Sequence, residues 1–117
     1  MYNQKNNGEK KKVPELIAYA GPIETTDAYA TALKVKLPPQ ISKAMVHIKE
    51  LDANDIDWKI LSSIDDDIYF EEMAEAEVSQ DNSDVCEVTK AWIYLDVQVK
   101  SAVSDNSGEI AVAVSGA

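Results

Sequence analysis

Arginine is absent from this chain of 117 residues, so all 11 of its basic residues are lysine. They stand against 21 acidic residues, which gives a formal net charge of −10 at neutral pH. Phosphate groups are recognised best by arginine side chains and basic patches, and anionic membrane surfaces repel an acidic protein. The composition therefore predicts no nucleic-acid partner and no membrane partner.

Cysteine, histidine and glycine are also scarce, and each shortage excludes a class of chemistry. Cys86 is the only cysteine, so the chain can form no internal disulfide and no cysteine-based zinc site. His47 is the only histidine, has no evident nucleophile as a partner, and is expected at the surface. The four glycines are scattered, which excludes a glycine-rich phosphate loop. We therefore expect no enzymatic activity and no cofactor.

Two acidic segments remain as candidate metal sites. The segment that starts at Asp52 begins like a calcium loop, but its sixth position is Asp57 and its twelfth is Ser63, where such loops need glycine and glutamate. The run of aspartates over residues 65–67 is explained better as a solvated turn. The sequence therefore predicts no metal ligands.

Long apolar runs are missing as well. The longest, Ile110–Val114, is far shorter than the roughly 20 residues that cross a bilayer. Residues 1–12 are polar, so we expect no signal peptide and synthesis in the cytoplasm. These residues also have little to bury, which predicts a flexible basic arm ahead of one domain over residues 13–117. The arm is either a solvated tail or a segment that docks on an acidic partner surface through Lys10, Lys11 and Lys12.

Short segments with an apolar period of two, separated by turn residues, make up the rest of the chain. Such a pattern is typical of an all-β protein, and about seven to eight strands predict an antiparallel β-sandwich or jelly roll. Residues 68–78 suit either a helix or the second strand of a hairpin, and we favour the strand. Residues 80–84 are expected to be a loop. The predicted strands are 16–20 (ended by Gly21-Pro22), 28–37, 41–51, 56–64, 68–78, 92–103 and 110–114.

The clearest alternation lies in residues 92–103. Trp92, Tyr94 and Asp96 fall on one face of this strand, and the face with Val97 at its centre is apolar. Trp92 and Tyr94 are candidate anchors of a partner contact, unless a second sheet covers them. The last strand is expected to pair back on this one. The predicted core residues are Ile93, Leu95, Val97 and Val99, with Ile110, Val112 and Val114 beside them.

The second half of the chain resembles small β-sandwich proteins of tailed bacteriophage and prophage virions. Trp58–Tyr69 is an apolar strand, an acidic turn and an aromatic residue, Ala91–Lys100 is a long alternating strand, and Ser107–Ser115 is a closing strand after a Ser-Gly turn. These modules look like head decoration proteins and fibre bases, and they are also similar to galactose-binding sandwiches. The shared motifs specify strands and turns, and no functional residue is carried over from them.

The resemblance implies a non-enzymatic virion structural protein. Such a protein would bind, stabilise or decorate the capsid or tail of a bacteriophage, and would be made in the host cytoplasm before joining the virion. Its expected partner is a capsid or tail protein of the same particle. Accessory virion proteins sit on local symmetry axes, so we also expect a homo-oligomer, with a trimer favoured. The alternative is a β-sandwich module that binds carbohydrate or a host surface.

Overall fold

The computed structural model describes residues 15–80, 82–89 and 93–117. These residues form eight β-strands and contain no helix, and so include none that could span a membrane. Lys10, Lys11, Lys12 and Trp92 lie outside the described residues. The strands are β1 (Glu15–Glu24), β2 (Ala30–Lys36), β3 (Ala44–Glu50), β4 (Ile56–Ser63), β5 (Phe70–Val78), β6 (Ser83–Val88), β7 (Tyr94–Ser101) and β8 (Glu109–Gly116).

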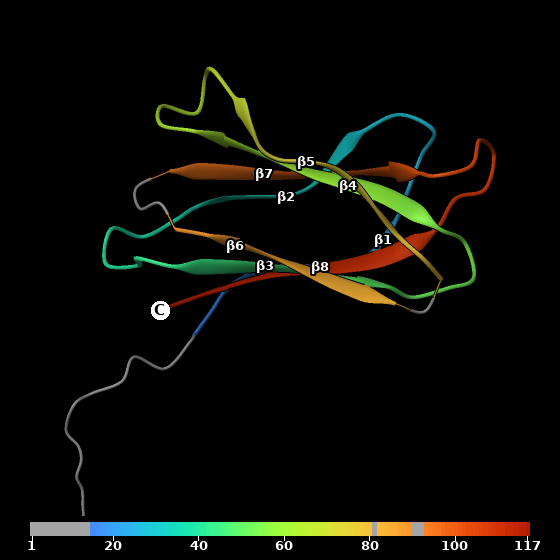
Figure 1. Ribbon diagram of the computed structural model, residues 1–117, viewed down its shortest axis with the longest axis horizontal. Helices are drawn as coiled ribbons and strands as arrows, with labels where there is room; N and C mark the ends of the chain where they lie inside the picture. The colour runs from blue at the N-terminus through green and yellow to red at the C-terminus, as the bar shows by residue number, and fades with distance from the viewer. Residues whose placement is uncertain (1–14, 81, 90–92) are drawn as a thin grey trace, which may run out of the picture.

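Two antiparallel sheets of four strands pack face to face (Figure 1). Sheet A has the strand order β1-β8-β3-β6, and sheet B has the order β2-β7-β4-β5. The antiparallel sandwich that the alternating pattern predicts is therefore confirmed. Strands β1 and β2 lie at one long side of the sandwich, and β5 and β6 lie at the other.

The core lies between the sheets and is built mainly from alternate residues of β3, β4, β7 and β8, with single residues from β5 and β6 and a few from the connecting segments. Strand β4 contributes Trp58, which is completely buried, as are Leu95 and Val97 of β7. The predicted register of the last two strands is confirmed, because every residue assigned to the core is at most 6% exposed. Buried apolar area of this kind is the main source of stability in a small domain. The core residues of β7, of β8 and of the position just before β7 are Ile93, Leu95, Val97, Val99, Ile110, Val112 and Val114.

The hairpin predicted around the acidic turn is also confirmed, since β4 and β5 pair antiparallel. Its turn is held by side-chain oxygens that accept hydrogen bonds from backbone N–H groups. Asp65 Oδ1 accepts the N–H groups of Asp67 and Ile68 at 3.0 and 3.2 Å, and Ser63 Oγ accepts that of Asp66 at 3.0 Å. Asp66 has a φ of 63°, a left-handed conformation that aspartate tolerates better than most residues.

The predicted pairing of the last strand with its predecessor is wrong. Strand β8 pairs with β1 and β3 in sheet A, whereas β7 lies in sheet B, so the connection between them crosses the sandwich. Gly108 fixes this crossing, because its N–H donates to Thr25 Oγ1 and its carbonyl accepts the Thr25 N–H, both at 2.8 Å. An alternating pattern fixes which face of a strand is buried but says nothing about its neighbour.

Two other expectations fail at the edges of sheet A. Strand β1 does not end at Gly21-Pro22 but continues to Glu24 with a register shift between Ala20 and Ile23. A side chain at Gly21 would meet the backbone of Ala111 at 2.8 Å, so glycine allows the close approach. The loop expected at residues 80–84 gives way at Ser83 to strand β6, whose short polar sequence carries little alternation.

Asp96 lies on the face of β7 opposite the core, as predicted, but it is only 8% exposed. Its carboxylate accepts hydrogen bonds from Thr31 Oγ1 at 2.8 Å and from Gln98 Nε2 at 3.0 Å. Neighbouring side chains therefore cover the outer face of this central strand, which the alternation alone does not reveal.

Candidate interaction surface

The outer face of sheet B is covered by a network of polar and charged side chains around Tyr29. The Tyr29 hydroxyl donates to Glu75 Oε2 at 2.5 Å, and Lys59 Nζ lies 4.3 Å from the ring centroid. Lys100 Nζ lies 3.6 Å from Asp57 Oδ2, which adds an ion pair across β7 and β4. Burial, together with the Glu75 carboxylate, raises the pKa of Tyr29, so this phenol stays protonated. These contacts satisfy the middle of the face within the molecule.

The same face continues toward the β4–β5 turn. Lys34 Nζ lies 3.0 Å from Asp66 Oδ1 and 5.2 Å from the centroid of the Tyr69 ring. Tyr94, the one sequence-predicted contact residue that is described, is half-buried here, and Lys36 Nζ lies 5.3 Å from its ring centroid. The other predicted contact residues lie outside the described residues, and Tyr94 already has a neighbour within its own chain.

Sheet A presents a different outer face. One register row crosses all four of its strands through Tyr19, Ala113, His47 and Val85. Ala113 lies between two completely buried residues of β8, so its methyl group points outward. The outward-facing alanines of β8 are smaller than their neighbours on β1 and β3, Tyr19 and His47, which leaves a hollow along β8.

This hollow is a shallow groove of about 490 Å³, here called the sheet A groove. Its apolar residues are exposed at its margins, with Tyr19 58%, Val85 46% and Leu51 39% accessible. Contiguous apolar surface of this kind marks binding surfaces in soluble proteins, whereas single exposed apolar residues are ordinary. The lining residues are Tyr19, His47, Ile48, Lys49, Leu51, Ser83, Asp84, Val85, Ala111, Val112 and Ala113.

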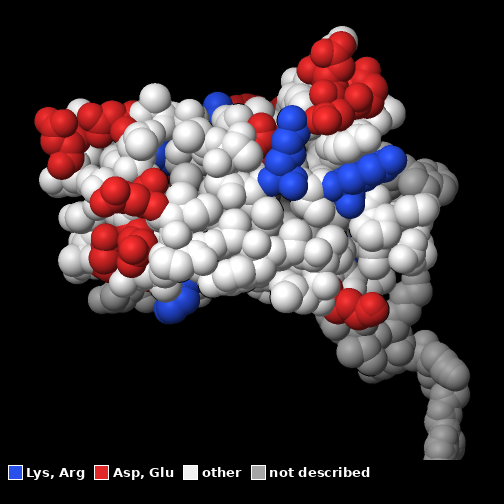
Figure 2. Space-filling model, turned by 180° about the vertical axis from the view of Figure 1, so that it is seen from behind, with Lys and Arg blue, Asp and Glu red and all other residues white. Residues whose placement is uncertain are grey.

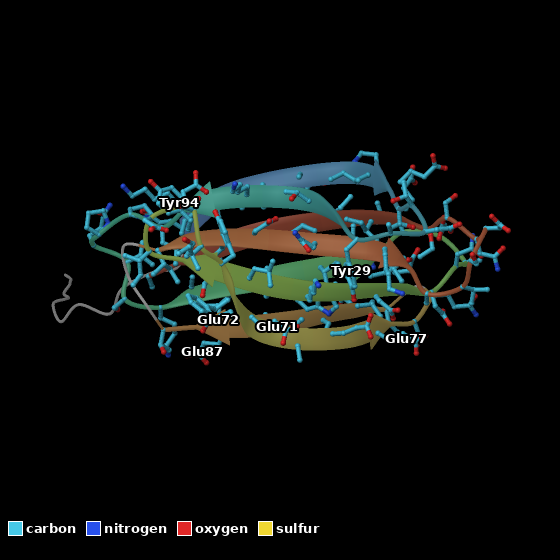
Figure 3. The ribbon with its side chains drawn as sticks, turned by 90° about the horizontal axis from the view of Figure 1, so that it is seen from above. Tyr29, Glu71, Glu72, Glu77, Glu87 and Tyr94 are labelled. Atoms are coloured by element: carbon cyan, nitrogen blue, oxygen red, sulfur yellow. The ribbon has the colours of Figure 1, made fainter. Side chains whose placement is uncertain are left out.

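The two long sides of the sandwich differ in charge. Figure 3 shows Glu71, Glu72, Glu77 and Glu87 spread along the side formed by β5 and β6. Figure 2 views the molecule from behind, which is the side of β1 and β2. Neutral side chains cover much of the middle of this view, and acidic side chains lie toward its ends. Contacts with another acidic protein are therefore opposed at the β5–β6 side more than at the opposite side.

A buried carboxyl group lies at the end of β3. Glu50 is 1% exposed, and its Oε1 accepts the Asp52 N–H at 2.8 Å. Its Oε2 has no hydrogen-bond partner among the described residues. Burial raises the pKa of Glu50 to about 7, and the neighbouring Asp52 carboxylate adds to the shift, whereas the pKa of Asp52 is lowered by its contact with Glu50. The pair therefore holds one proton, on Glu50, below about pH 7 and loses it as the pH rises through this value.

The side chains with reactive or metal-binding chemistry are scattered. His47 is exposed, as expected, and its Nε2 lies 3.2 Å from Ser115 Oγ. Cys86 is a free thiol whose pKa is raised by burial and by nearby carboxylates, so it is a poor nucleophile. Within the described ranges, histidine, cysteine, aspartate and glutamate side chains do not group to hold a metal ion. The sheet A groove is thus the candidate site, and its residues are suited to non-covalent binding of a partner.

Sequence reasoning did not find the sheet A groove, because its residues come from strands that are distant in sequence. The alternation of alanines with valines over residues 110–114 was a usable signal, since it implies small side chains on the outer face of β8. No protein-family model and no curated protein matches the sequence.

Proposed function

We propose that the chain is a non-enzymatic binding protein that contacts other proteins through the sheet A groove. The observation that carries this proposal is the difference between the two outer faces of the sandwich. Polar contacts within the chain cover the middle of sheet B, whereas sheet A exposes Tyr19, Leu51 and Val85 around an alanine floor. Protein interfaces have apolar and aromatic residues at their centre, so sheet A supplies the suitable surface.

The finer proposal is an accessory structural protein of a bacteriophage virion, which attaches to the capsid or tail. It is supported by the resemblance of the Trp58–Tyr69, Ala91–Lys100 and Ser107–Ser115 segments to virion sandwiches. A compact antiparallel sandwich is compatible with that role. The experiment described next also distinguishes this role from the alternative of carbohydrate binding.

The test uses Ala113→Lys, which places a charged chain on the floor of the sheet A groove without entering the core. Purified protein is mixed with phage particles produced from the genome that encodes it, and particle-bound protein is measured after density-gradient banding. We expect the wild-type chain to band with particles and Ala113→Lys to reduce occupancy at least about tenfold, as loss of a central contact does.

Ala74→Lys is the matched control, since Ala74 is an exposed alanine on β5 of the other sheet. It should bind particles like the wild type, and both variants should keep the wild-type thermal midpoint. Wild-type protein that stays free of particles but is retained on a glycan array would overturn the virion proposal. Equal occupancy of the two alanine variants would show that the sheet A groove is not the contact.

A further inference from the structure

The β4–β5 hairpin ends in a cluster of exposed apolar side chains. Ile64 is 84% exposed, Ile68 61% and Phe70 69%, and all three lie within seven residues of chain. We call these three side chains the hairpin knob. Large apolar side chains at the tip of a projecting turn lower the solubility of a protein unless a binding partner covers them. The knob therefore has the composition of an interface anchor.

The backbone that carries the knob is preorganised. The Asp65 carboxylate and the Ser63 hydroxyl hold the backbone N–H groups of the turn, as described above. Asp66 connects the turn to β2 of sheet B through Lys34, and it accepts a hydrogen bond from the Tyr69 hydroxyl within the turn. A presented surface that is already ordered loses little conformational entropy on binding, which favours association.

The hairpin knob and the sheet A groove cannot meet within one molecule. The knob belongs to the hairpin of sheet B, which extends away from sheet A at one end of the sandwich (Figure 1). The sheet A groove opens on the outer side of the opposite sheet. Two complementary surfaces on opposite sides of one chain can be satisfied only by two copies.

We propose that the hairpin knob of one copy docks into the sheet A groove of a second copy. The apolar side chains of the knob meet the apolar lining of the groove around Ala113, and Phe70 supplies a large aromatic anchor.

One opposite-charge pair is also available, because the exposed Asp67 carboxylate beside the knob can meet the exposed Lys49 ammonium in the groove. The other two aspartates of the turn, Asp65 and Asp66, are engaged by turn N–H groups and by Lys34. Asp84 also lines the groove, on the edge strand β6. It pairs in register with Ile48, which faces the core, so its side chain starts from the opposite face of the sheet to that of Lys49.

This contact joins two different surfaces, so each copy in an assembly has both a donor knob and an acceptor groove. Such heterologous contacts close into a ring when the rotation between copies allows it, and otherwise extend into a filament. The homo-oligomer expected from the sequence resemblance, with a trimer favoured, would be a closed ring of this kind. The inference deepens the proposed function, since it names the groove's partner, but self-association is measured without any particle.

The experiment combines two variants that each remove one half of the contact. The double substitution Ile68→Ser and Phe70→Ser removes the knob, and Ala113→Lys blocks the groove. Analytical ultracentrifugation up to about 1 mM protein detects even contacts of millimolar dissociation constant. We expect oligomers for the wild type, and for each variant alone a dissociation constant raised at least about 30-fold, the factor that accompanies loss of a strong anchor.

An equimolar mixture of the two variants gives the decisive result. The groove-blocked chain keeps its knob and the knob-less chain keeps its groove, so one intact contact remains, and heterodimers should form without larger species. A monomeric wild type, self-association by the knob-less variant at wild-type strength, or a mixture without heterodimers would each overturn the proposal. The substituted positions are exposed or half-exposed, and an unchanged thermal midpoint of each variant excludes unfolding as the cause.

The charge match has its own test. Lys49→Asp and Asp67→Lys should each weaken self-association by about two- to fivefold, the size of an exposed ion pair. Combining Lys49→Asp and Asp67→Lys in one chain restores opposite charges, in swapped positions, at every knob-to-groove contact between its copies. That double variant should regain wild-type affinity, and the absence of any recovery would show that Asp67 and Lys49 do not meet.

Discussion

Replacing Val97 by aspartate is expected to abolish folding. Val97 is completely buried at the middle of β7, between Leu33 of β2 and Ile60 of β4. A carboxylate at this position would be buried without a partner, at a cost of more than about 4 kcal/mol. That cost is comparable with the whole stability of a small domain, which is about 5–15 kcal/mol. Circular dichroism and urea titration would show a chain without a cooperative transition.

The neighbouring position supplies the control. Asp96→Ala acts on the opposite face of β7 and leaves Thr31 Oγ1 and Gln98 Nε2 without their carboxylate acceptor. Because Asp96 is nearly buried, the expected loss is about 1–2 kcal/mol in the free energy of unfolding, rather than the negligible loss of an exposed site. The variant should therefore remain folded, and equal damage from the two substitutions would contradict the register of β7.

Raising the pH from about 4.5 to 7 is expected to destabilise the protein through Glu50. Its folded pKa of about 7 lies above the ordinary value of 4.5, so in this window the folded state keeps a proton that the unfolded chain releases. The contribution to stability is complete below pH 4.5 and is lost as the pH rises through 7. Its size is up to about 3 kcal/mol in the free energy of unfolding, which denaturant titrations at a series of pH values would measure.

Glu50→Gln is the matched variant, because glutamine has the shape of the protonated acid but no proton to release. The variant should lack this part of the pH dependence, so its stability relative to the wild type should increase steadily between pH 5 and 7.5. Measuring the difference between the two proteins cancels the titration of the carboxylates that do not contact Glu50. Asp52 does contact Glu50, but its lowered pKa acts at lower pH and with the opposite sign. Parallel pH profiles would show that Glu50 titrates as an ordinary glutamate.

Strong local patterns allowed the all-β class, the hairpin of β4 and β5 and the buried face of β7 to be predicted. In β7 and the residue before it, the alternation from Ile93 to Val99 leaves one apolar face, and burial of that face fixes the direction of every side chain. The aspartates between β4 and β5 supply turn chemistry that acts over a few residues. These features depend on neighbours in sequence, which is why the sequence was sufficient.

The features that sequence reasoning missed depend on contacts between distant segments. The choice of β8 between β7 and β1 rests on Gly108 meeting Thr25, which is 83 residues away in the chain. Strand β6 is an edge strand with one partner, so it needs little apolar alternation and resembles a loop in sequence. The sheet A groove exists only after four strands are aligned, and no single segment encodes it.

The glutamates along β5 and β6 have a consequence for fibril formation. Both are edge strands, and their outer backbone groups would otherwise be templates for strand addition by another chain. Adding a second copy there would place ionised carboxylates of two chains about 5 Å apart, which opposes stacking in register. On the other side, the register shifts and Pro22 interrupt β1. Register shifts also interrupt β2 and β5, whereas β6 pairs without one. Acid neutralises only the carboxylate barrier, so β6 is the edge where amyloid-like growth of this sandwich would begin.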